Sequence, residues 1–165
     1  MDKYYYFISQ LPMLFFEKPG GITIEYFLNE AQKWLGARDY SILSSVDMHD
    51  IALEKKGNRV QALYRTFEFG VKHDIASWRK ARREKQEFKT RSFPVSLIKE
   101  GNPLDVEKKL LQLRWDFIDT KEREHHFDLG FIICYYIKLQ ILHRLTTFNK
   151  EKGEQIYKNL CEVTE

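Results

Sequence analysis

The sequence has few cysteines and no glycine motif for binding nucleotides. Its two cysteines, Cys134 and Cys161, do not make a disulfide or zinc framework, and reduced thiols are typical of a cytosolic protein. None of its eight glycines belongs to a G-x-x-x-x-G-K-S/T or G-x-G-x-x-G pattern, the patterns that cradle phosphates. These absences argue against a disulfide-rich secreted protein and against direct nucleotide hydrolysis.

Long apolar runs are also missing. The longest uncharged apolar run near the C-terminus covers residues 129–137, and its nine residues fall well short of the roughly 20 that a membrane-spanning helix needs. The apolar N-terminus is interrupted at Pro12, and Glu17 and Lys18 stand where a signal peptide would have its small-residue cleavage site. We therefore expect neither a spanning helix nor a signal peptide, and at most a peripheral position on a membrane.

Charge of one sign is not in excess either. The 27 basic and 24 acidic residues leave a formal net charge of +3, which is too small for a dedicated nucleic-acid-binding protein. The composition is 43% hydrophobic and 31% charged, as in folded globular proteins. A chain of 165 residues has the length of one domain with its own core, so we expect a single domain over residues 1–165.

The hydrophobic periodicity predicts a mainly α fold of about five helices. They are expected at about 24–35, in a short segment capped by Asp39, at 59–88, from Pro103 to about 120, and from about 128 toward 160. Thr23 and Asn102 are the predicted N-caps of two of them. Asn149 or Gly153 is the expected break if the last helix is interrupted. The consecutive Tyr and Phe of 3–9 favour a short N-terminal strand or extended arm.

The last predicted helix, within 127–163, is the most apolar part of the chain. Its first half is apolar on every side, and charge returns only toward its end. A helix that is apolar all round is buried in a core, in a membrane or in an assembly. The length of the run argues against the membrane and leaves core and assembly as the alternatives.

The densest group of potential metal ligands precedes this helix and comprises Glu122, Glu124, His125, His126 and Asp128. Only Glu122 and His126 are four residues apart and share a helix face, whereas a zinc site takes three or four converging ligands. His49 can join them only through the fold. We favour a solvated polar helix entry over a metal site, and we expect no cofactor.

A nucleophilic triad of Cys134, His143 and Asp128 is a further possibility that the sequence raises. Cys134 lies inside a strongly apolar run, where a thiol is usually inert. We therefore favour a buried structural cysteine and expect the protein not to be an enzyme.

The sharpest charge feature is the segment 72–91. It carries eight cations against Asp74, Glu84 and Glu87. Three interpretations remain open: a solvated helix end, a docking surface for an acidic protein, or a nucleic-acid site. Nucleic acid is the least favoured, because aromatic residues are not interleaved as stacking platforms. The residues that we expect to contact a partner are Arg79, Lys80, Arg82, Arg83, Lys85 and, in the last helix, Arg144.

Three stretches together resemble a small bacterial protein family of unknown function whose genes accompany those of V/A-type rotary ATPases. They read YYYFISQLP at 4–12, LRWDFID at 113–119, and HFDL at 126–129 leading into YYIKLQILHR at 135–144. The chain is also distantly similar to the C-type stalk protein of these proton- or sodium-transporting enzymes, whose eukaryotic counterpart is called the d-type. It is much shorter than that stalk protein and lacks its threefold internal repeat.

The resemblance implies an all-helical, non-catalytic subunit or accessory that links the central stalk to the membrane ring. Such a protein is cytoplasmic and peripheral at the inner face of the membrane, with the stalk and ring proteins as partners. The resemblance also favours the core for the apolar part of the last helix, and leaves 143–158 for a partner. The competing interpretation is a helical protein that binds nucleic acid through 72–91.

Overall fold

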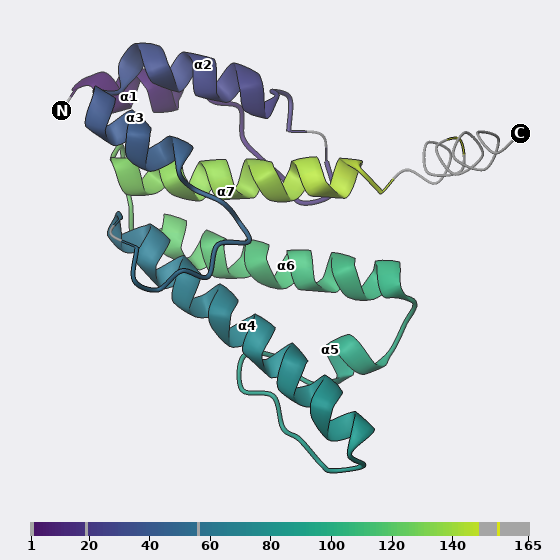
Figure 1. Cartoon of the computed structure of the whole chain (residues 1–165). Helices are drawn as coiled ribbons and strands as arrows, with labels where there is room; N and C mark the ends of the chain where they lie inside the picture. Colours follow the sequence, from purple (N-terminus) through teal and green to yellow (C-terminus); the bar gives the residue numbers. More distant parts are fainter. Residues whose placement is uncertain (1, 19, 56, 149–154, 156–165) are drawn as a thin grey trace, which may run out of the picture.

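The computed structural model describes residues 2–18, 20–55, 57–148 and 155. Within these residues it contains no strand and seven helices: α1 (Asp2–Ser9), α2 (Ile24–Trp34), α3 (Ala37–Ser44), α4 (Arg59–Arg83), α5 (Ser96–Lys99), α6 (Pro103–Glu122) and α7 (Leu129–Thr146). The prediction of a mainly α fold is confirmed. Figure 1 shows α6 between α7 and the C-terminal half of α4, with α1, α2 and α3 beyond α7.

The predicted strand at 3–9 is wrong, because these residues form helix α1. The reason is their helical spacing: Tyr4, Phe7 and Ile8 share one face and pack on the core, and the Phe7 side chain is 1% exposed. Tyr5 and Tyr6 point to the other side and are about half exposed. A run of aromatic residues favours strands on average, but tertiary packing decides the outcome here.

Two of the predicted helix starts are confirmed. The Thr23 hydroxyl accepts a hydrogen bond from the Tyr26 N–H at 3.1 Å, and the Asn102 side chain accepts one from the Asp105 N–H at 2.9 Å. The expected cap at Asp39 is wrong, since α3 begins two residues earlier after Gly36. Asp39 instead accepts a hydrogen bond from the Tyr4 hydroxyl at 2.5 Å, which ties α3 to α1.

Helix α4 is shorter than predicted and ends at Arg83 instead of Phe88. Lys85 adopts a left-handed backbone conformation with φ of 56°. The Gln86 N–H then reaches back to the Ala81 carbonyl at 2.8 Å, so the chain closes the helix with a Schellman-type turn.

The apolar helix α7 is buried in the core of the chain, as predicted. Ile133, Ile137 and Ile141 are fully buried in it, and Phe27 of α2 stacks on both Tyr135 and Tyr136 with ring centroids 5.4 Å apart. The expected extension toward Leu160 and the expected break at Asn149 or Gly153 lie outside the described residues. In the part of the chain that the structure describes, no helix is long and apolar enough to cross a membrane.

A second, smaller apolar cluster supports the C-terminal half of α4. Val71 of α4, Leu110 of α6 and Phe93 of the intervening segment form it. This cluster holds α4, α5 and α6 together at the end of the molecule farthest from α2 (Figure 1). The end of α4 is therefore carried on a packed support.

Candidate functional site

The C-terminal end of α4 presents a dense group of exposed cations. We call it the basic end of α4, and it consists of Arg79, Lys80, Arg82, Arg83 and Lys85, all of them exposed. Among the described residues, no ion pair joins any of them to a carboxylate. The Arg82 guanidinium lies 5.4 Å from the centre of the Trp78 ring, a cation–π contact that holds the charge at the surface. These five charges are free to meet an acidic partner.

Arg144 does not belong to this surface. It lies on α7, where its Nε is 3.6 Å from the Glu107 carboxylate of α6 and its guanidinium is 4.9 Å from the centre of the Phe148 ring. Figure 1 places α7 on the opposite side of α6 from the basic end of α4. The structure therefore brings five of the six predicted contact residues together and separates the sixth.

Asp74 fixes the chain that follows the basic end of α4. Its carboxylate accepts the backbone N–H groups of Arg91 and Ser92, both at 2.7 Å. Burial alone would raise the pKa of Asp74, but the hydrogen bonds from Ser92 and Arg91 outweigh it and hold the pKa below its ordinary value. The ionised carboxylate thus clamps the return segment against α4.

Replacing Asp74 with Asn tests this clamp through its pH dependence. The lowered pKa means that the carboxylate stabilises the fold fully above its unfolded pKa of about 3.9, and that this contribution is lost as pH falls through the folded-state pKa. Urea unfolding of D74N and wild type at pH 7, 5 and 3 should therefore show a gap in stability that narrows toward pH 3. A gap that stays constant over this range would contradict the clamp.

The acidic and histidine cluster before α7 is used for local contacts. The Glu122 carboxylate contacts the Lys138 ammonium, and His125 Nδ1 lies 2.8 Å from the Asp128 carboxylate. His49 lies elsewhere, beside α4, where the Lys72 ammonium donates to its carbonyl at 2.6 Å. Among the described residues, no three His, Cys, Asp or Glu side chains gather as a metal site.

Cys134 is buried in α7, as predicted. Burial, followed by the charge of Glu122, raises the pKa of its thiol to about 12, so the thiol stays protonated at neutral pH. His143 lies nine residues further along the helix, about 13 Å away along its axis. Asp128 caps the helix by accepting the Phe131 N–H at 2.8 Å. The three groups are too dispersed for a nucleophilic triad.

Buried ion pairs tie the helices together, and the sequence reasoning missed them. The carboxylate of Glu68 in α4 accepts two hydrogen bonds from Arg114 in α6, at 2.8 and 2.9 Å, and Glu68 is fully buried. Lys138 of α7 donates to Asp119 of α6 at 2.9 Å. A weak signal was present, because Glu68 lies between Tyr64 and Val71 on the apolar stripe of α4. A charged residue on such a stripe points to a buried partner.

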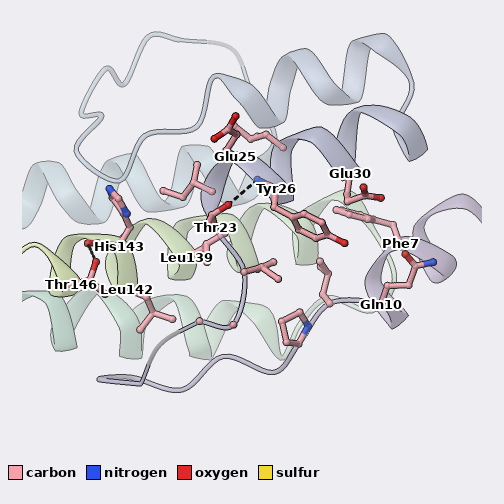
Figure 2. Close-up of a pocket in the computed structure, with 17 residues that line it drawn as sticks. Phe7, Gln10, Thr23, Glu25, Tyr26, Glu30, Leu139, Leu142, His143 and Thr146 are labelled. Carbon is pink, nitrogen blue, oxygen red and sulfur yellow. Dashed lines mark hydrogen bonds between the residues drawn. The ribbon is translucent and has the colours of Figure 1, made fainter.

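A groove with a volume of about 1310 Å³ lies between α1, α2, α7 and the segment joining α1 to α2 (Figure 2). Polar groups stand at its rim, with Glu25 and Glu30 on α2 and His143 and Thr146 on α7. Apolar side chains line the rest: Phe7, Leu11, Pro12, Ile22, Ile24, Leu28, Leu139 and Leu142. The prediction that residues from His143 onward are left for a partner agrees with the place of His143, but its remainder beyond 148 falls outside the described ranges.

The groove wall formed by the joining segment is fixed to α7 at two points. The Tyr135 hydroxyl donates to the Pro12 carbonyl at 2.9 Å. Gly20 lies so close to α7 that an added Cβ would stand 3.2 Å from Leu139 and 3.4 Å from Leu142. Sequence reasoning could not find this groove, because its walls come from segments more than 100 residues apart.

Comparison with known proteins gives one match. Residues 92–165 match a family model described as "Protein of unknown function (DUF2764)". A DUF2764 domain lies at residues 92–165. The DUF2764 match covers α5, α6 and α7, and it leaves α1 to α4 outside. No curated protein and no solved structure matches the chain, so these comparisons give no link to the C-type stalk protein of V/A-type ATPases.

Proposed function

We propose that this chain is a non-catalytic subunit or accessory of a bacterial V/A-type rotary ATPase, and that it connects the central stalk to the membrane ring. The basic end of α4 is the observation that carries the proposal. Its five exposed cations suit an acidic protein surface, and anionic headgroups at the inner face of the membrane are a second acidic neighbour. The resemblance of the sequence to proteins encoded beside these ATPases supplies the identity of the partner.

The way the helices are joined supports the same proposal. A linking subunit must resist bending, because it passes torque or holds two bodies at a fixed spacing. The Glu68–Arg114 pair joins α4 to α6, and the Lys138–Asp119 pair joins α6 to α7. These contacts and the core around α7 make a stiff support for the basic end of α4.

Charge reversal at Arg79, Arg82 and Arg83 tests the proposal. The tagged full chain, as wild type or as the triple variant to Glu, is isolated from gently solubilised membranes of the native host. The three residues are exposed, so we expect the fold to be retained, while opposing like charges cost several kcal/mol at an interface. Recovery of ATPase subunits, measured by quantitative mass spectrometry, should fall at least about tenfold.

A matched control reverses Arg38, Arg59 and Arg123, which are also exposed, and should leave recovery unchanged. Unchanged recovery in the Arg79, Arg82 and Arg83 variant would return the basic end of α4 to a solvated helix end. Recovery of nucleic acid with wild type, and of no ATPase subunit, would favour the competing nucleic-acid interpretation.

A further inference from the structure

We propose that the groove between α1, α2 and α7 is a docking site for one amphipathic helix of a partner protein, with Lys or Arg beside the apolar face of that helix. The groove and the basic end of α4 lie on opposite sides of α6 (Figure 1). The inference rests on the proposed function for the identity of the partner and on the groove itself for the chemistry of the partner.

The dimensions of the groove fit a helix. Its α7 wall runs from Leu139 to Thr146, about 10 Å along the helix axis, and its α2 wall runs from Ile24 to Glu30, about 9 Å. These lengths correspond to about two turns, the span over which an amphipathic helix places anchors at i, i+3 or i+4, and i+7. The volume of about 1310 Å³ exceeds the 300–1,000 Å³ that is typical of small-molecule sites.

The lining supplies apolar contact and aromatic anchoring. Ile22, Ile24 and Leu28 are half-buried, so part of each side chain remains open to an occupant. Tyr26 stands at the mouth with its side chain 55% exposed, and a tyrosine in such a position is typical of binding hot spots. Apolar surface of this kind matches the apolar face of a helix.

The charge at the rim selects the flanks of that helix. Glu25 is exposed on α2, and no ion pair to it is found among the described residues. Glu30 lies 2.5 Å from the Lys33 ammonium, whose side chain is mostly exposed and can move aside. His143 is the single other titratable group among the described lining residues apart from Tyr26. An acidic rim favours cations on the partner and disfavours an anionic bilayer or an acidic peptide.

The groove is already formed before any partner arrives. The Tyr135–Pro12 hydrogen bond and the close approach of Gly20 to α7 hold the joining segment in place. A preformed site avoids the entropic cost of ordering a wall on binding, which raises affinity for a given contact area. The fixed wall therefore supports recognition of a helix of matching width.

Photo-crosslinking from the mouth of the groove tests the proposal in the native host. Tyr26 of the full chain is replaced by p-benzoylphenylalanine, which is also aromatic and sits at an exposed position; Phe69 on α4, 42% exposed, receives the same replacement as a control. The adduct of the Tyr26 variant is digested and mapped by mass spectrometry. We expect a segment with apolar residues every three or four positions and Lys or Arg beside them, and no such adduct from the Phe69 position.

Adducts that map to residues 149–165 of this chain, to a second copy, to lipid or to an acidic segment would each overturn the proposal. Leu28→Lys, which puts a charge into the groove, should lower the yield of the Tyr26 adduct at least about tenfold, and Glu25→Lys should lower it severalfold. Their controls are Leu53→Lys and Glu54→Lys at exposed positions outside the groove, which should leave the yield unchanged. An unchanged yield with Leu28→Lys would also overturn the proposal.

The two proposals fail in distinguishable ways. Adducts with a basic amphipathic helix of a protein outside the ATPase would uphold the docking site and contradict the proposed function. Co-purification of ATPase subunits without any helical adduct at Tyr26 would uphold the proposed function and contradict the docking site.

Discussion

Replacing Glu68 with Ala is expected to cost about 3–5 kcal/mol of unfolding free energy. The substitution leaves the Arg114 guanidinium buried, at 5% exposure, without the carboxylate that accepts two of its hydrogen bonds. Natural domains are stable by about 5–15 kcal/mol, so this loss is a large share of the total. Urea unfolding at pH 7, followed by circular dichroism, measures it.

Two controls separate the buried pair from an ordinary surface contact. Glu124→Ala removes the 2.7 Å contact with Lys121 at a site that is half exposed, and it should cost less than about 1 kcal/mol. The double variant Glu68→Leu with Arg114→Met removes both buried charges and should recover most of the loss, because the desolvation cost disappears with them. If Glu68→Ala costs no more than Glu124→Ala, the pair does not join α4 to α6 as we describe.

Replacing Ile133 with Asp is expected to abolish folding or to cause aggregation. Ile133 is fully buried in α7, and an unpaired carboxylate in an apolar core is among the most costly changes a single substitution can make. Ile133→Val removes one methylene and should cost only about 0.5–1.5 kcal/mol. The comparison uses the soluble fraction on expression and the thermal midpoint of the purified variants.

The control for the charge itself is Leu53→Asp. Leu53 is 53% exposed, so the same apolar-to-Asp change there should alter stability by less than about 0.5 kcal/mol. Normal solubility and melting of the Ile133→Asp variant would show that this face of α7 is not in the core.

Local signals in the sequence predicted the long helices well. Thr23 and Asn102 cap the helices that they were expected to cap, because an N-cap depends on residues within one turn of it. The apolar part of α7 is buried in the core as expected, since its periodicity leaves no polar face. These features depend on neighbours in the sequence and therefore can be found there.

The errors arise where distant residues decide the structure. The aromatic residues at 3–9 form a helix because Phe7 packs on Phe27 with ring centroids 5.6 Å apart, a contact that local propensity does not contain. Glu122 was considered as a metal ligand, whereas it contacts Lys138 from the next helix. Lys138 itself follows the apolar run and is buried at 5% exposure, which only a carboxylate partner makes tolerable.

The candidate surfaces were predictable to different degrees. The basic end of α4 is continuous in the sequence, so its five cations were identified in advance, and only Arg144 was grouped with them wrongly. The groove combines Leu11, Leu28 and Leu142, which the fold brings together from three separate segments. A surface of this second kind needs the tertiary structure.

The central claim is that the chain is a linking component of a V/A-type ATPase. The most direct test is to purify that ATPase from the native host through a tag on another of its proteins, and to quantify this chain in the purified complex by mass spectrometry. We predict that the chain is present at a fixed ratio to the other subunits and stays with them through gel filtration. A complete ATPase that contains none of this chain would contradict the account.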